Sequence, residues 1–302
     1  MSEIVSTARR RELGAELRRI REGCGYNGID MALRLNWAPS MVSRAETGKR
    51  PMTRIEVATY TALCGVAGQR LTGLLGLADE PDDNRLKSHG DLVADALRTL
   101  VFHEQTAVEI ESFQPIYIPG VAQTEDYARA VFEGTGIIKP ADIENFVQIR
   151  VARRDVITRF RPAQCTFYVH ENVLRTPIGS PQVMHEQMLH LLFLDTRPQC
   201  SIRVVPVTAG SRGTAAGSFQ IFGYTEGAPV VCVQHESTSE FLENGHHLAS
   251  YRSVLRRLAS VALDEASSRA MIALVASDYE RQGVAGYERG AGERAGLAQE
   301  QL

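Results

Sequence analysis

The stretch WAPSMVSRAETGKRP, residues 37–51, predicts a short helix followed by a basic loop. Pro39 suits the first turn of a helix, because the N–H that proline lacks has no intrahelical partner there. Val42 and Ala45 are three residues apart and share one face of the helix. Gly48 is a typical residue just past a helix end. A helix of about two turns is unstable alone, so we expect it to pack on neighbouring helices and to offer its polar face to a partner.

Four more helices are expected around this segment. The predicted helices cover residues 9–24, 29–35, 39–47, 53–64 and 71–77. In the first of them, Leu13 and Leu17 recur at the spacing of one helical face. Thr53 and Glu56 form the capping-box pattern at the start of the fourth. The sequence therefore predicts an all-α five-helix domain over residues 1–78.

The rest of the chain mixes helices with β-rich runs and predicts an α+β domain with a small, mostly antiparallel sheet. The predicted strands cover 164–170, 200–207, 218–225 and 229–235. The predicted helices cover 91–112, 142–160, 246–263 and 264–281, with one more after Thr124 and one after Ser180. The Gly-rich segment 208–218 is expected to be a hairpin loop between two strands or, as the alternative, a loop that faces a ligand or partner.

A polar, proline-containing stretch at 79–84 is the best candidate for a domain boundary. We predict a five-helix domain at 1–78, a linker at 79–90 and an α+β domain at 91–281. The Gly/Ala/Glu-rich composition of 282–302 predicts a disordered tail.

Charge is distributed unevenly along the chain. Residues 1–64 contain eleven Lys and Arg against seven Asp and Glu, whereas the remainder contains 22 against 29. A basic module joined to an acidic body is a pattern of nucleic-acid contact. No apolar run approaches the ~18 residues of a membrane span, and residues 1–14 lack the apolar core of a secretory signal. Five scattered cysteines without a CxxC motif fit a reduced, cytosolic protein, so we predict a cytoplasmic protein without a membrane partner.

Two short helices joined by the tight turn at Asn36 and Trp37 are typical of a helix-turn-helix, which places its second helix in the major groove of DNA. The expected base-edge contacts come from Ser40, Met41 and Arg44. The expected phosphate contacts come from Asn27, Ser43, Lys49, Arg50 and Arg54. The predicted partner is a double-stranded DNA operator.

One module of this size covers one half-site, which gives little affinity alone, so a homodimer is expected. Leu248, Tyr251, Leu255 and Leu258 recur at helical spacing and are candidates either for the dimer interface or for the core.

The stretch RRIREGCGYNGIDMALRLNWAPSMVSRAETGKRP, residues 18–51, resembles the XRE-type (lambda-repressor-like) helix-turn-helix, and the resemblance covers 11–77. It implies a helix-to-helix ion pair between Arg21 and Glu46. Asn36 stands where the family often has glycine, and asparagine also tolerates a positive φ. Ala38 and Pro39 replace the commoner Ser-Gln, which removes one polar base-reader.

A second resemblance covers about 95–278. The segments PGVAQTEDYARAV, VARRDVI, HENVLRTPIGSPQVMHEQMLHLL and VTAGSRGTAAGSFQIF are similar to an antitoxin-like domain of unknown function that follows such DNA-binding domains in actinobacteria. The resemblance implies a transcription regulator, and a small partner protein encoded nearby.

An enzyme in the second domain is disfavoured. His185 and His190 of HEQMLH are five residues apart, about 140° on a helix, so they do not match the zinc spacing H-E-x-x-H. The segment AGSRG is not G-x-S-x-G, and GTAAGS lacks the lysine of a P-loop. Arg150, Arg154 and Arg161 share a helical face that is expected to be solvated or salt-bridged, or else to meet an acidic partner or phosphates. We predict no catalytic residue, metal or cofactor.

The leading hypothesis is a sequence-specific DNA-binding transcriptional regulator, cytoplasmic and nucleoid-associated, whose second domain mediates dimerisation, partner sensing or both. The alternative is an antitoxin-like adaptor that sequesters a small partner protein and autoregulates its own operon.

Overall fold

The computed structural model describes residues 7–79, 85–87, 92–215, 217–235 and 239–299 of the 302-residue chain. The chain divides into two compact units. The first combines Met1–His103 with Gly223–Ala249, and the second combines Glu104–Phe222 with Ser250–Leu302. Most of the expected linker at 79–90 lies outside the described residues, and the expected domain limits stay predictions.

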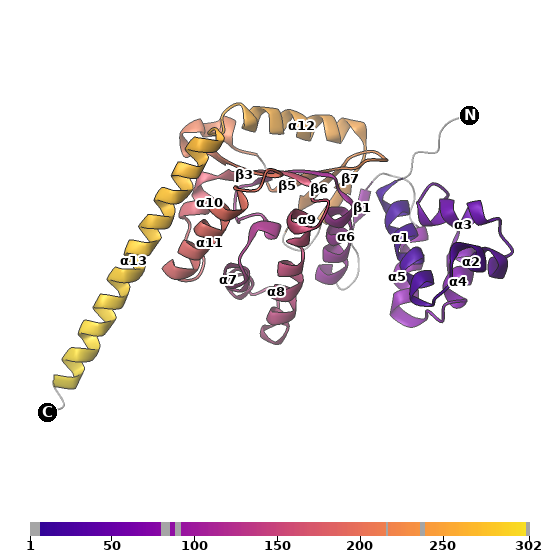
Figure 1. Cartoon of the computed structure of the whole chain (residues 1–302), viewed down its shortest axis with the longest axis horizontal. Coiled ribbons are helices and arrows are strands. Elements are labelled where there is room, and N and C mark those ends of the chain that lie inside the picture. Colours follow the sequence, from indigo (N-terminus) through magenta and orange to yellow (C-terminus); the bar gives the residue numbers. More distant parts are fainter. Residues whose placement is uncertain (1–6, 80–84, 88–91, 216, 236–238, 300–302) are drawn as a thin grey trace. The chain divides into compact units, whose positions relative to one another are not determined.

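A run of short helices opens the first unit, as the sequence predicts (Figure 1). The helices are α1 (Ala8–Gly23), α2 (Gly28–Leu35), α3 (Pro39–Glu46), α4 (Arg54–Ala62) and α5 (Gly68–Asp79). Thr53 and Glu56 make the expected capping box at the start of α4, and Asn27 and Asp30 make a second one at the start of α2. Local sequence therefore fixes where these helices begin.

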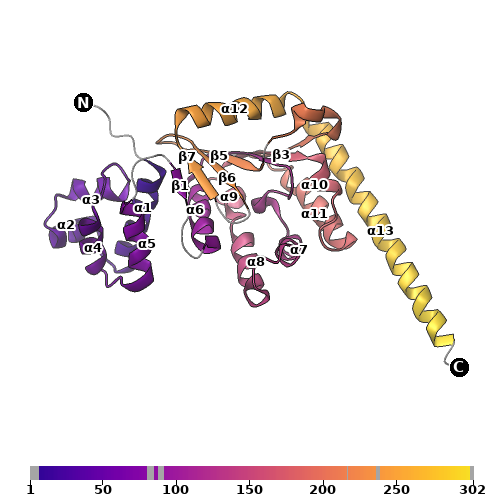
Figure 2. The ribbon, with the colours of Figure 1, turned by 180° about the vertical axis from the view of Figure 1, so that it is seen from behind.

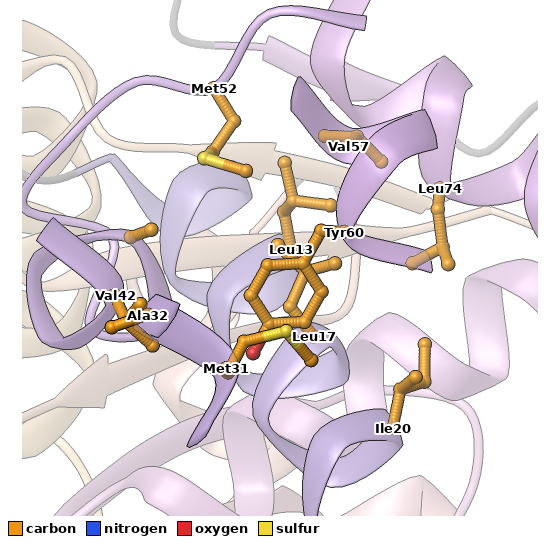
Figure 3. Packing of buried hydrophobic residues seen from close by; sticks show 11 residues of the cluster. Leu13, Leu17, Ile20, Met31, Ala32, Val42, Met52, Val57, Tyr60 and Leu74 are labelled. Atoms are coloured by element: carbon orange, nitrogen blue, oxygen red, sulfur yellow. The ribbon is translucent and has the colours of Figure 1, made fainter. Parts of the chain in front are cut away.

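The core of these helices is small and apolar (Figure 3). The ring of Tyr60, from α4, lies at its centre beside Leu13 and Leu17 of α1 and Met31 of α2. Val42 anchors α3 in the same cluster and is 1% exposed. Burial of these side chains holds together helices that are too short to be stable separately.

The first unit also contains most of α6 (Leu92–Thr106) and three antiparallel strands. They are β1 (Arg85–Lys87), β6 (Val230–Gln234) and β7 (Ser239–Leu242), with β7 in the middle. Phe241 pairs with Leu86 of β1 and with Cys232 of β6. The prediction of a helix over 91–112 is wrong at its C-terminal end, because α6 stops at Thr106.

The strands of the second unit overturn the expected antiparallel arrangement. They are β2 (Glu109–Gln114), β3 (Gln164–His170), β4 (Cys200–Val205) and β5 (Phe219–Gly223), in the order β5-β2-β3-β4. β2 pairs with β3 and β3 with β4 in parallel, with Phe167 opposite both Ser112 and Ile202. The chain thus contains parallel and antiparallel pairs, and the parallel ones are possible because helices cross over between successive strands.

Helices fill those crossovers. They are α7 (Glu125–Thr135), α8 (Ile143–Ala152), α9 (Asp155–Thr158), α10 (Glu171–Arg175) and α11 (Pro181–Leu194), with α12 (Gly245–Ala259) and α13 (Glu265–Gln299) following the strands. The short 3-10 helices are η1 (Gly120–Ala122), η2 (Pro140–Asp142) and η3 (Val207–Gly213). Both views show α12 on one face of β3 and β5, with α7, α8 and α11 on the other (Figures 1 and 2).

Three further expectations differ from the structure. The helix expected over 142–160 is two helices, since the chain turns between Ala152 and Asp155. The segment 208–218 is not a hairpin loop, because β4 and β5 are not neighbours in the strand order. α13 is described through to Gln299, within the segment 282–302 for which the sequence predicts disorder. Alanine and glutamate in that segment favour a helix, whereas its glycines do not.

Candidate nucleic-acid interface

The turn between α2 and α3 has the geometry of a helix-turn-helix. Asn36 adopts a left-handed conformation with φ 56° at the end of α2, as expected for an asparagine in place of glycine. The backbone N–H of Trp37 then donates to the carbonyl of Ala32 at 2.8 Å. Pro39 occupies the first turn of α3, where no backbone N–H is needed. Three residues, Asn36, Trp37 and Ala38, therefore join the two helices.

A close backbone approach places α3 against α1. A Cβ atom on Gly14 would lie 2.5 Å from the carbonyl oxygen of Glu46 and 2.6 Å from that of Ala45, so no side chain fits at this position. Gly48 follows in a left-handed conformation with φ 69° and closes α3. The role of Gly14 could not be predicted from the sequence, because an isolated glycine is tolerated inside a helix whether or not another backbone approaches it.

A polar cluster ties α3 to α1 and α4. The guanidinium of Arg21 donates from Nε to Glu46 Oε1 at 2.7 Å and from Nη2 to Oε2 at 2.8 Å. The hydroxyl of Tyr60 donates to Glu46 Oε1 at 2.5 Å. Arg21 also donates to the carbonyl of Tyr26 at 2.7 Å. The hydrogen bond with Glu46 raises the pKa of Arg21, and burial, followed by the bond to Glu46, raises the pKa of Tyr60.

The residues expected to contact bases lie on the outer side of α3. Ser40 and Arg44 are exposed and Met41 is half-buried, whereas Val42 and Ala45 are buried. The side chain of Arg44 donates from Nε to the carbonyl of Ser40 at 3.2 Å, which holds it along the helix. The exposed side chains form one face that can enter a groove.

Some of the residues expected to contact phosphates are exposed, and others are paired with a glutamate. Ser43 and Arg54 are exposed. Asn27 is also exposed, and its side-chain oxygen caps α2 by accepting from two backbone N–H groups.

The ammonium of Lys49 donates to Glu226 at 2.8 Å. Arg50 pairs with Glu56 and lies over the ring of Trp37, 4.9 Å from its centroid, which gives it a structural role as well.

A groove of about 380 Å³ opens between α1, α2 and α3. Arg18, Ser43 and Thr47 line it together with the start of α2 at Asn27 and Gly28. Arg18 and Thr47 are exposed hydrogen-bond donors at this groove and join the candidate phosphate contacts. Their place beside Ser43 depends on the packing of the helices, so it could not be predicted from the sequence.

The arginines of the second unit serve another purpose. Arg153 is buried and donates to both oxygens of Glu104 at 2.8 and 2.7 Å. Arg150 and Arg154 both bind Gln123, at its side-chain and backbone oxygens respectively. The expectation of one helical face for Arg150, Arg154 and Arg161 is wrong, because α8 ends at Ala152, α9 ends at Thr158 and Arg161 lies beyond both. Arg150 and Arg154 instead hold the loop around η1 in place, and Arg161 is exposed.

The histidines of HEQMLH make separate contacts. Nδ1 of His185 lies 2.9 Å from the carbonyl oxygen of Ala276, and the ring of His190 stacks on Phe193. Within the described parts of the chain, no group of three or more His, Cys, Asp and Glu residues is arranged to hold a metal ion. Among the same residues, no helix is both long enough and apolar enough to cross a membrane.

The fold and the face of α3 define a protein of the helix-turn-helix class, which indicates a DNA-binding regulator. Comparison with known families agrees, since residues 12–73 match the helix-turn-helix domain family and 97–273 match the domain of unknown function DUF5753. The second match covers more than half of the chain, so the protein belongs to the DUF5753 family. These matches confirm the helix-turn-helix resemblance and the domain of unknown function that follows it, whereas the antitoxin-like character of that domain stays a prediction. No curated protein matches the chain.

Proposed function

We propose that the protein is a sequence-specific, double-stranded-DNA-binding transcriptional regulator that acts in the cytoplasm. The observation that carries the proposal is the two-sided character of α3. Val42 and Ala45 anchor the helix in the core, while Ser40 and Arg44 point away from it. The Arg21–Glu46–Tyr60 cluster fixes the orientation of α3 before DNA arrives, which lowers the entropic cost of reading base edges.

The two kinds of contact separate in one experiment. We expect Arg44→Ala to relax sequence preference, because a bidentate arginine–guanine contact contributes ~1–3 kcal/mol of discrimination. We expect Lys49→Ala to weaken binding to all sequences alike and to reduce the salt dependence by about one phosphate contact. The measurement is selection of bound sequences from a random duplex library by the full chain, followed by titration of selected and random duplexes at several salt concentrations.

Arg281→Ala is the matched control, because Arg281 is an exposed arginine on α13 whose described ion pair is with Asp278. It should change neither preference nor affinity. Equal losses on selected and random duplexes for Arg44→Ala would contradict the assignment of Arg44 as a base-reader. Failure of the unaltered chain to enrich any sequence would contradict the proposed function itself.

Homodimerisation is part of the proposal, because two helix-turn-helix modules about 34 Å apart would read two half-sites on one face of the duplex. Leu255 and Leu258 are buried within the chain itself, 4% and 0% exposed, so they support the core rather than a surface for a second copy. Sedimentation of the free protein and of its complex with the selected duplex measures the stoichiometry. A monomer in both states would exclude the homodimer and favour assembly by a small partner protein.

A further inference from the structure

Two helices of the first unit end in the same way, and each end carries a cysteine. α1 is followed by Cys24 and Gly25, and α4 by Leu63, Cys64 and Gly65. Both glycines adopt the left-handed conformation, with φ 75° and 68°. At both ends a backbone N–H reaches back to the carbonyl five residues earlier, from Tyr26 to Arg21 at 3.2 Å and from Val66 to Thr61 at 3.1 Å. This is the hydrogen-bond pattern of a Schellman motif.

The two ends lie side by side, so their cysteines meet. The thiol of Cys24 donates to the backbone carbonyl of Cys64 at 3.6 Å. Burial, followed by the neighbouring side chain of Cys24, raises the pKa of Cys64 to about 11. Cys24 is exposed and Cys64 half-buried. The other three cysteines of the chain, Cys165, Cys200 and Cys232, are buried.

We propose that Cys24 and Cys64 form an oxidation site at which a hydroperoxide closes a reversible disulfide. The sulfur of the exposed Cys24 attacks one peroxide oxygen, the O–O bond breaks, and Cys24 becomes a sulfenic acid while the first water (or an alcohol) leaves. The sulfur of Cys64 then attacks the sulfenic sulfur, the S–S bond forms, and the second water leaves. Two thiols are oxidised and one hydroperoxide is reduced. A small thiol restores the reduced pair by thiol–disulfide exchange.

The position of the pair decides what the disulfide does. It would close the segment 24–64, which contains α2, α3 and α4. Arg21 lies one turn before Cys24, and Tyr60 lies one turn before Cys64, so the disulfide would join the same two helices that Glu46 bridges by hydrogen bonds. A crosslink restricts the unfolded chain, so the oxidised domain should unfold at a higher temperature than the reduced one.

The test uses the reduced, full-length protein treated with one equivalent of hydrogen peroxide, alkylated and digested with trypsin. We expect one linked species that joins peptides 22–34 and 55–70, two hydrogens lighter than their sum and separated again by dithiothreitol. The melting temperature should rise on oxidation. Cys24→Ser should abolish both effects, and Cys232→Ser, which removes a buried thiol, is the matched control that should keep them.

Three results would overturn the proposal. The first is that the two peptides remain separate after oxidation, with Cys24 recovered as a free thiol or a sulfinic acid. The second is that the linked species joins labelled to unlabelled chains when the two are mixed before oxidation, since the link is then intermolecular. The third is a melting temperature that does not change when the link forms. The first two results come from the unaltered chain, so they do not depend on whether a variant folds.

Discussion

At the scale of single residues, Glu46 is the side chain on which the orientation of α3 depends. Its two oxygens accept from Arg21 and Tyr60, and the side chains of Arg21 and Glu46 are only 8% and 7% exposed. Removing one partner of a buried pair leaves the other charge or donor unsatisfied, and this costs more than the pair contributes. The resemblance to XRE-type domains implied the contact with Arg21, whereas the contact with Tyr60 required the structure.

We therefore expect Glu46→Gln to destabilise the helical part of the first unit by about 2 kcal/mol, because the neutral amide cannot accept from all the donors around it. Chemical denaturation of the full-length protein, followed through the fluorescence of Trp37, measures the change. Glu22→Gln is the control, since Glu22 is an exposed partner of Arg18 and Arg21 and its loss should leave the transition almost unchanged. An unchanged midpoint for Glu46→Gln would contradict this role.

Residues whose role is local were predictable from the sequence. The capping pair Thr53 and Glu56, the left-handed Asn36 and the helix-starting Pro39 act through neighbours within four positions. The ion pair between Lys49 and Glu226 joins residues 177 positions apart, and no periodicity carries that information.

At the scale of elements, the packing of α3 against α1 depends on the absence of a side chain at Gly14. We expect Gly14→Ala to destabilise the first unit by about 3 kcal/mol, because the new methyl group would collide with the backbone carbonyls of Ala45 and Glu46, which cannot rotate away. Thermal unfolding measures the effect.

Gly23→Ala is the matched control on the same helix, because a Cβ at Gly23 would meet no atom within 4 Å. It should leave stability unchanged or raise it by up to about 1 kcal/mol, since alanine is the better helix former. If the two substitutions shifted the melting temperature equally, the close approach of α1 and α3 would be wrong.

Element types were easier to predict than their pairing. The strand at 164–170 was predicted at its observed bounds, because its sequence QCTFYVH is rich in the aromatic and β-branched residues that favour strands. Residues 109–112 of β2 were assigned to the preceding helix, because Ile110 and Phe113 are three residues apart and this spacing also fits one face of a helix. The parallel pairing of β2, β3 and β4 was not predictable, because it depends on how the helices between these strands pack on the sheet.

At the scale of the whole molecule, each unit brings together segments that are far apart in the chain. In the first unit, Glu243 accepts hydrogen bonds from the backbone of Ala8 and from the side chain of Arg11, more than 230 positions earlier. His103 is in the same unit, 0% exposed, with its Nδ1 at 2.6 Å from the hydroxyl of Tyr224 and its ring stacked on Phe241. Burial, followed by the charge of Arg11, lowers the pKa of His103 to about 3.

This buried histidine makes stability depend on pH. The pKa of His103 is lower in the folded chain than the ordinary value of 6.5, so below that pH the unfolded state binds more protons. The contribution of neutral His103 is complete above pH 6.5 and is lost as the pH falls towards 3. By pH 5 we expect a loss of about 2 kcal/mol. Denaturation midpoints should decrease as the pH is lowered from 7 to 4.5, and the decrease should be smaller in His103→Gln. Some of the decrease should remain in that variant, because burial also lowers the pKa of His190, to about 4.

Tyr224→Phe separates the two possible causes of the slope. Because burial is the main cause of the lowered pKa, removing only the hydroxyl that faces Nδ1 should lower stability at every pH and keep the steep acid slope. A shallow slope in Tyr224→Phe would mean that the hydrogen bond, rather than burial, keeps His103 neutral. An unchanged slope in His103→Gln would show that His103 does not titrate across this range. Comparing slopes rather than midpoints keeps the test valid even though each variant differs in absolute stability.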